Sequence, residues 1–141
     1  MDIEDLDEVE SLSAPLPNPW SPNMFLEEMQ NPCSHCFIIG VKESSRERVI
    51  GFICFRIVAD ESELLNVCVH PRYRQLGIGR KLMQFYTDFC REKKIKSFYL
   101  EVNAVNQPAL RLYELFSYQP SGTRKKFYQG KWDALLMVKK L

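Results

Sequence analysis

The stretch from Leu64 to Val102 constrains the fold of this 141-residue chain more than any other part of the sequence. Its first run, Leu64 to Val69, is apolar and typical of a strand. A helix is predicted from about Gly77 to Lys93, and a second strand from Ser97 to Val102, where apolar and polar side chains alternate. The expected apolar stripe of the helix consists of Ile78, Leu82, Phe85 and Phe89. A strand, a crossover helix and a strand in this order imply two parallel neighbouring strands.

The part of the chain before this unit begins with two predicted helices. Asp5 to Ser13 has apolar side chains at helical spacing. Ser21 reads as an N-cap followed by a proline at the first helical position, so a second helix should run from Pro22 to Gln30. Between the helices, an extended loop is predicted by the prolines Pro15, Pro17 and Pro19.

Strands are predicted next, at His35 to Val41 and at Val49 to Val58, with a polar turn over Lys42 to Arg48. Asp60 and Glu61 mark another turn before the strand that begins at Leu64. These three strands should form an antiparallel meander.

The last part of the chain predicts one helix and two strands. The helix runs from Asn106, a plausible N-cap, to Leu115. The strands are Thr123 to Tyr128 and Asp133 to Val138, joined around Gln129-Gly130. The element order ααβββαβαββ predicts one α+β domain over residues 1–141, with a central mixed sheet flanked by about four helices.

The segment from Val67 to Lys81 predicts an anion-binding site. A strand ends there, a loop with two glycines follows, and a helix begins. The N–H groups at a helix start lack internal partners and carry partial positive charge, and glycines let the backbone approach a phosphate closely. Four cations crowd this end of the helix: Arg72, Arg74, Arg80 and Lys81. Because cations at the positive end of a helix dipole are unfavourable, the pattern favours a bound anion over its alternative, a solvated basic patch.

Two common phosphate motifs are excluded, because the sequence has neither a G-x-x-x-x-G-K-[ST] loop nor a third glycine for a dinucleotide fingerprint. Instead, Arg74-Gln75-Leu76-Gly77-Ile78-Gly79 matches the R/Q-x-x-G-x-G/A pattern of the GNAT superfamily of N-acetyltransferases. The similarity extends over nearly the whole chain. It resembles the RimI-type N-acetyltransferases, which modify the N-terminal alanine of a ribosomal protein, at Pro19-Trp20-Ser21, Leu100-Glu101-Val102, Asn106 to Tyr113 and Tyr128 to Leu135.

The sequence departs from the family pattern at two places. Ser117-Tyr118 stands where the family usually has Gly-Phe, and Lys131-Trp132-Asp133 replaces a more acidic turn. The first change is compatible with the predicted helix and strand, whereas the second bears on acceptor preference.

The resemblance implies acetyl-CoA as the co-substrate. The loop amides would hold its pyrophosphate, and the preceding strand would pair with its pantetheine arm. Asn106 would contact the same arm, a plain N-cap being the alternative. The cofactor-binding residues assigned in this way are Val67, Cys68, Val69, Gln75, Leu76, Gly77, Ile78, Gly79, Arg80 and Asn106.

The resemblance also assigns Glu101 as the general base and Tyr113 as the general acid that protonates the departing thiolate. Spacing alone favours other interpretations of both residues. Glu101 would be a surface glutamate, paired for example with Arg111, and Tyr113 would be a core aromatic residue. Trp20 and Tyr128 would line the acceptor channel, although large aromatic side chains are more often core.

Three functions remain open from the sequence. The first is acetylation of a protein N-terminal α-amine, that of a ribosomal protein being the leading candidate. At pH 7 roughly a tenth of α-amines are neutral, against roughly one lysine in a few thousand, so an α-amine needs only modest base assistance. The second is acetylation of a small-molecule amine or a lysine. The third is a noncatalytic acyl-CoA-binding module.

Composition argues against several other partners. The net charge of +1 gives no reason to expect nucleic-acid binding, and no apolar run is long enough to span a membrane. The acidic start does not resemble a secretory signal, and five cysteines are an odd number, so we expect a cytoplasmic protein with reduced thiols. We expect a monomer or weak dimer.

Cys33-Ser-His-Cys36 is the one possible metal half-site, and because His70 is the only other histidine, no metal is expected. The closing hairpin is basic, with Arg124, Lys125, Lys126 and Lys131. We expect it to be solvated, a contact with an acidic peptide or ribosomal surface being the alternative.

Overall fold

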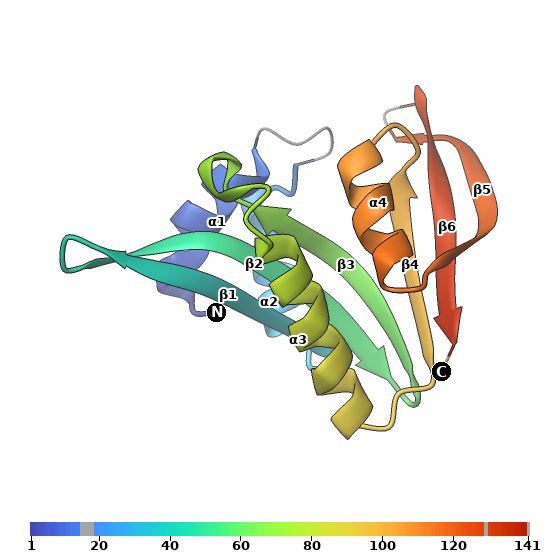
Figure 1. Ribbon diagram of the computed structural model, residues 1–141, viewed down its shortest axis with the longest axis horizontal. Coiled ribbons are helices and arrows are strands. Elements are labelled where there is room, and N and C mark those ends of the chain that lie inside the picture. The colour runs from blue at the N-terminus through green and yellow to red at the C-terminus, as the bar shows by residue number, and fades with distance from the viewer. Residues whose placement is uncertain (15–18, 129, 141) are drawn as a thin grey trace.

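The computed structural model describes residues 1–14, 19–128 and 130–140. They form a six-stranded mixed sheet in the order β1-β2-β3-β4-β6-β5, with four α-helices in the described part of the chain (Figure 1). The strands are β1 (Ser34–Glu43), β2 (Arg46–Val58), β3 (Glu61–Val69), β4 (Ser97–Asn103), β5 (Gln119–Tyr128) and β6 (Trp132–Lys140). The helices are α1 (Leu6–Ser13), α2 (Pro22–Gln30), α3 (Ile78–Glu92) and α4 (Gln107–Leu115).

The predicted fold class and element order are confirmed, because each predicted helix and strand exists with ends shifted by a few residues. Ser21 caps α2 by accepting a hydrogen bond from the Met24 N–H at 3.2 Å. Two short 3-10 helices, Ile3–Asp5 and Pro71–Tyr73, were not predicted. The prolines 15 and 17 of the predicted loop and Gln129 of the closing turn lie outside the described residues.

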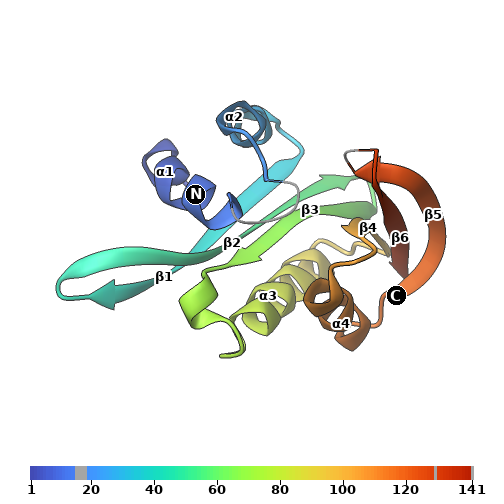
Figure 2. The same cartoon turned by 90° about the horizontal axis from the view of Figure 1, so that it is seen from above.

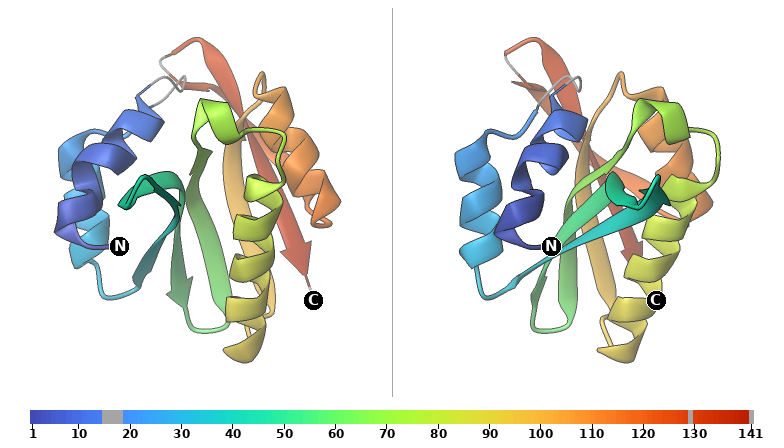
Figure 3. Two further views of the ribbon diagram at one scale, coloured as in Figure 1. Left: turned by 60° about the vertical axis from the view of Figure 1, so that its left-hand side comes forward. Right: turned by 90° about the vertical axis from the view of Figure 1, so that its left-hand side faces the viewer.

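The helices cover the sheet on both faces, α1 and α2 on one and α3 and α4 on the other (Figures 2 and 3). Two buried clusters correspond to these layers. The larger contains Leu82, Tyr86 and Phe98 between α3 and the sheet, and the smaller contains Val9 and Phe25 of the first two helices. Burial of these apolar faces is the main stabilising contribution to the fold.

One residue of the predicted α3 stripe is misplaced, because Phe85 is 42% exposed. The buried face of α3 is centred further round the helix and consists of Ile78, Leu82, Met83, Tyr86, Thr87 and Cys90. At 100° per residue, Phe85 falls at the edge of this face, where its ring contacts Phe37 of β1 with 4.8 Å between the centroids.

Strands β3 and β4 run parallel, as predicted, but only over their first residues. The pairing begins at Glu61 and Ser97 and ends at Leu64 and Leu100. Opposite β2, the register shifts so that Leu65 becomes an extra residue in β3, a β-bulge that bends the strand at this point. Beyond the bulge the two strands diverge, as their separated ends in Figure 1 show. The sheet therefore opens between β3 and β4.

A partly buried ion pair fastens α2 to the sheet. The Glu28 carboxylate accepts hydrogen bonds from Arg56 Nε at 2.8 Å, from Arg56 Nη2 and from Ser34 Oγ at 2.6 Å. The hydrogen bond from Arg56 lowers the pKa of Glu28, and this effect outweighs the opposing effect of burial. Because the pKa is lower in the folded state, the stabilisation is present above the ordinary glutamate pKa and is lost as the pH falls below about 4.5.

We expect Glu28→Gln to lower the free energy of unfolding at pH 7 by roughly 1–2 kcal/mol, discounted for the exposure of Arg56, and to reduce the acid dependence of stability. Urea denaturation at pH 7 and pH 4 measures both effects. Glu27→Gln, an exposed neighbour on the same helix, is the control. Equal stabilities of the two variants at pH 7 would contradict the assignment.

Candidate active site

A pocket of about 170 Å³ lies where β3 and β4 diverge. Leu65 to Val67 of β3 and Glu101 to Asn103 of β4 form two of its sides. Five residues singled out in the sequence line it together, although they come from distant parts of the sequence: Trp20, Glu101, Asn106, Tyr113 and Tyr128. Of the predicted cofactor strand, Val67 also reaches this pocket. The structure thus brings the predicted base, the predicted acid and the predicted acceptor aromatics to one place.

Glu101 projects from the face of β4 opposite the buried side chains of Phe98, Leu100 and Val102, as the alternation predicts. Its side chain is 26% exposed. Its carboxylate Oε1 lies 3.3 Å from Nη2 of Arg124 on β5. The ion pair considered from the sequence, with Arg111, is therefore replaced by one with Arg124. A half-buried carboxylate at the pocket surface is positioned to accept a proton from a bound molecule.

Tyr113 is buried in α4. Burial, assisted by the nearby Tyr128 phenol, raises the pKa of Tyr113, so its hydroxyl stays protonated at neutral pH. The phenol is therefore chemically able to donate a proton into the pocket. It also packs in the larger core cluster, so the core interpretation of this tyrosine is correct as far as packing is concerned.

Asn106 caps α4, as predicted. Its Oδ1 accepts a hydrogen bond from the Ala109 N–H at 3.3 Å. Because this bond occupies one lone pair of Oδ1 only, the side-chain NH2 and the remaining lone pair stay available at the pocket surface.

The predicted phosphate loop lies outside this pocket, at the far end of β3. Gly77 precedes α3 in a left-handed conformation with φ of 79°, which favours glycine. Gly79 packs closely on α4, because a Cβ built there would lie 3.3 Å from Leu112 Cδ2. The side chains of Arg72, Arg74, Arg80 and Lys81 are exposed, and none pairs with an acid in the described ranges. The loop therefore carries uncompensated positive charge beside the N-terminus of α3.

Comparison with known proteins identifies the family. The sequence model of the Acetyltransferase (GNAT) family matches residues 5–118. A candidate [ribosomal protein bS18]-alanine N-acetyltransferase of Bacillus subtilis (strain 168) is 33% identical over 140 residues, covering 97% of this chain and 90% of that protein. The chain belongs to the acetyltransferase (GNAT) family.

Solved structures show the GNAT fold over the full length of the chain. The ribosomal-protein-S18-alanine N-acetyltransferase from Escherichia coli matches with a TM-score of 0.86 at 26% identity, covering 99% of this chain and 90% of that chain. Arabidopsis thaliana NAA60 in complex with acetyl-CoA matches with a TM-score of 0.87 at 21% identity, covering 100% and 96%. At that identity the second match establishes a common fold and nothing more.

The departure from the GNAT pattern at Ser117 has a structural explanation. Ser117 adopts a φ of 71°, in the left-handed region where the family's glycine is unstrained. The helix still ends at Leu115 and β5 still begins at Gln119, so the fold accommodates the serine, as expected. Tyr118 takes the buried aromatic position at 3% exposure.

Asn103 and Arg124 are among the residues at the site that were not predicted from the sequence. Asn103 lies two residues after Glu101, so strand alternation places it on the same face, and this signal could have revealed it. Arg124 was expected to be merely solvated. It reaches Glu101 across β6, and the register of β5 shifts directly after it, where the Lys126 N–H donates to Asp133 Oδ1 at 2.9 Å. No local sequence pattern indicates such a bulge.

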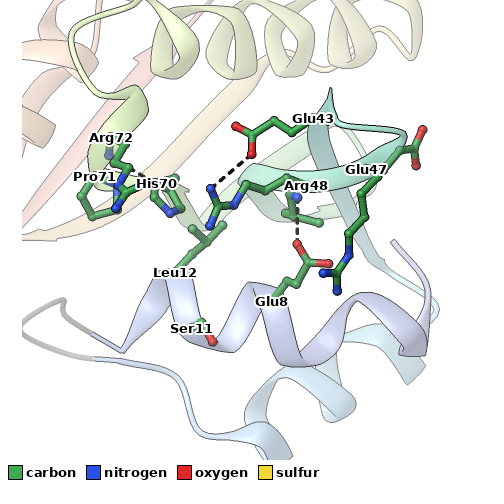
Figure 4. A pocket seen from close by; sticks show the side chains of 11 residues that line it. Glu8, Ser11, Leu12, Glu43, Glu47, Arg48, His70, Pro71 and Arg72 are labelled. Atoms are coloured by element: carbon green, nitrogen blue, oxygen red, sulfur yellow. Dashed lines mark hydrogen bonds and ion pairs between the residues drawn. The ribbon is translucent and has the colours of Figure 1, made fainter.

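A larger cavity, of about 730 Å³, lies elsewhere, between α1, the β1–β2 hairpin and the segment His70 to Arg72 (Figure 4). Some of its charged groups have partners within the protein. Glu8 Oε2 accepts from the Val49 N–H at 2.9 Å, and Arg48 pairs with Glu43 at 3.4 Å. Of the four cations of the predicted anion site, Arg72 lines this cavity, whereas none of the predicted catalytic and cofactor-binding residues does.

The two cysteines of the Cys33-Ser-His-Cys36 motif are free thiols. Within the described ranges, no group of three or more His, Cys, Asp or Glu side chains is arranged to hold a metal ion. Cys36 Sγ instead lies 3.1 Å from Cys54 Sγ on the neighbouring strand. No helix in the described ranges is both long enough and apolar enough to cross a membrane.

Proposed function

We propose that this GNAT protein transfers the acetyl group of acetyl-CoA to the N-terminal α-amine of a protein, in the cytoplasm. The N-terminal alanine of ribosomal protein bS18 is the first candidate acceptor. The observation that carries the proposal is the pocket between β3 and β4, where Glu101 and Tyr113 face one space. The acceptor is inferred from the B. subtilis and E. coli relatives, whose names specify this reaction.

Acetyl-CoA would lie along the gap in the sheet. The edge of β3 at Val67, Cys68 and Val69 has no strand partner on the β4 side within the described residues, so its backbone groups can pair with the pantetheine amides. The pyrophosphate would then meet the N–H groups from Gln75 to Arg80 and the cations around them. The thioester end would reach the pocket, where Asn106 adds a polar contact.

In the reaction, Glu101 accepts a proton from the acceptor ammonium, directly or through a water molecule. The neutral amine attacks the thioester carbonyl carbon, and a C–N bond forms. The attack leaves a positive charge on the nitrogen, and this nitrogen gives up its second proton through water to solvent. The tetrahedral intermediate collapses with cleavage of the C–S bond, and Tyr113 protonates the departing CoA thiolate. The products are the acetylated N-terminus and CoA, and proton exchange with solvent restores both side chains.

Incubation of the protein with acetyl-CoA and a peptide panel, read by mass spectrometry, tests the proposal. The panel contains the bS18 N-terminal peptide, variants with other first residues, and a blocked peptide whose only amine is a lysine. We expect acetylation of the free N-terminus, with alanine favoured. Modification of the lysine peptide alone would overturn the N-terminal assignment, and absence of CoA release with every peptide would favour a noncatalytic module.

Tyr113→Phe should lower kcat by about 10- to 100-fold, because the phenylalanine ring fills the same space but has no proton to donate. The affinity for acetyl-CoA should change little. Steady-state CoA release and calorimetry measure these quantities. Tyr118→Phe is the matched control, since Tyr118 is also buried, with its ring centroid 6.0 Å from that of Tyr113, but does not line the pocket. Equal kcat values in the two variants would remove Tyr113 from the mechanism.

A further inference from the structure

Asn103 has one buried group that the protein does not satisfy. It is the last residue of β4 and is 5% exposed. Its Oδ1 accepts a hydrogen bond from the Val105 N–H at 3.1 Å, which fixes the orientation of the amide and turns Nδ2 the other way. Nδ2 is the only buried side-chain nitrogen or oxygen in the described part of the chain without a hydrogen-bond partner. Such a group is unfavourable in a folded protein unless another molecule supplies the partner.

The position of Asn103 connects it with the proposed acceptor side of the site. Strand alternation places it on the same face of β4 as Glu101, about 7 Å further along the strand. Both residues line the pocket, together with Trp20 and Tyr128. A molecule that presents an amine to Glu101 would therefore have its neighbouring atoms within reach of Asn103.

The chemistry of Nδ2 limits what it can bind. A side-chain NH2 group donates hydrogen bonds and accepts none, so its partner must be an oxygen or another acceptor. In a peptide N-terminus, the carbonyl oxygen of the first residue lies only three bonds from the α-amine nitrogen. In a lysine side chain, four methylene groups follow the amine and no acceptor is near it.

We propose that Asn103 Nδ2 donates a hydrogen bond to the carbonyl oxygen of the acceptor's first residue, and so selects peptide α-amines over the ε-amine of lysine. This inference rests on the proposed function and deepens it. Asn103 contacts the substrate without taking part in proton transfer. Its contribution should appear as a preference between amines and not as a uniform loss of turnover.

Asn103→Asp is the most informative variant. It retains an oxygen that accepts from the Val105 N–H, and it replaces the donating Nδ2 group with an oxygen that can only accept. Asn103→Leu removes the donor without adding charge, and it serves if the aspartate variant does not fold. The matched control is Asn31→Asp, because Asn31 Oδ1 likewise accepts from the N–H two residues later, at 2.9 Å from Cys33, but lies outside the pocket. Thermal unfolding and acetyl-CoA affinity verify that each variant is folded.

The acceptors are an alanine-initiated peptide, the same peptide with its first carbonyl replaced by a thiocarbonyl, whose sulfur accepts hydrogen bonds weakly, and a blocked lysine peptide. For wild type, we expect the thiocarbonyl to lower kcat/KM about tenfold. For the Asn103 variants, kcat/KM on the normal peptide should fall about 10- to 100-fold. In these variants the thiocarbonyl peptide should have nearly the same kcat/KM as the normal peptide, because the hydrogen bond that it weakens is already absent. The preference for the α-amine over lysine should shrink by the same factor.

Two results would overturn the inference while leaving the proposed function intact. One is an unchanged preference in folded Asn103 variants, as expected if a buried water satisfies Nδ2. The other is an equal loss on all three acceptors, which would place the hydrogen bond on the thioester. If wild type acetylates no peptide N-terminus, the proposed function itself fails.

Discussion

Replacing Glu101 by glutamine is expected to lower kcat by about 10²- to 10³-fold while leaving the affinity for acetyl-CoA nearly unchanged. Glutamine has nearly the same size and can still accept a hydrogen bond from Arg124, but it cannot take a proton at neutral pH. The ion pair that it replaces is largely exposed, with Arg124 at 54%, so its loss should cost about 1 kcal/mol or less of stability. The loss of activity should therefore reflect chemistry and not unfolding.

Steady-state CoA release with a saturating N-terminal peptide measures this effect, and calorimetry measures the cofactor affinity. Glu63→Gln is the control, since it removes an exposed carboxylate from the neighbouring strand β3, outside the pocket. Full turnover by Glu101→Gln would show that another group, or water alone, accepts the proton.

Gly79→Glu should weaken acetyl-CoA binding by about 10- to 100-fold. The new Cβ would press on Leu112, 3.3 Å away, and the carboxylate would compete with the pyrophosphate for the amides and cations of the loop. Gly77→Glu should act in the same direction for a different reason. Its Cβ meets no atom within 4 Å, but its φ of 79° is strained for glutamate.

Isothermal calorimetry with acetyl-CoA measures both variants, with thermal unfolding as a check of folding. Asn23→Glu is the matched control, because it places the same new carboxylate in the first turn of α2, remote from the loop. Wild-type affinity in a folded Gly79→Glu protein would exclude the loop as the phosphate site.

The elements that could be predicted are those with strong local signals. Ser21-Pro22 defines the start of α2 because capping and proline geometry are local. The parallel pairing of β3 with β4 follows from the helix that separates them in sequence. The exposure of Phe85 could not be predicted, because it depends on which residues of α3 the sheet covers. Four apolar residues at helical spacing do not determine the centre of the buried face.

The candidate site also contains residues that could be predicted from the sequence and residues that could not. Resemblance located Glu101, Asn106 and Tyr113, and the fold brings them together in one pocket, while their catalytic roles stay predictions. The Arg124 partner of Glu101 depends on a bulge in β5 and on a reach across β6, which are tertiary features. Asn103 follows from alternation, but its unsatisfied amide appears only when every neighbouring donor and acceptor is placed.

The short parallel pairing between β3 and β4 has a consequence for the lifetime of the protein. The sheet consists of two three-stranded halves, β1-β2-β3 and β4-β6-β5, and only four residue pairs between β3 and β4 join them. A linear cofactor along the free edge of β3 would act as a noncovalent strand that complements the fold. Since a ligand that binds only the folded state stabilises it by about 2.7 kcal/mol at 100 times its Kd, acetyl-CoA would protect the chain from local opening and proteolysis. Because free CoA has the same pantetheine and pyrophosphate groups, the abundance of the protein in a cell would then follow the supply of CoA and its thioesters.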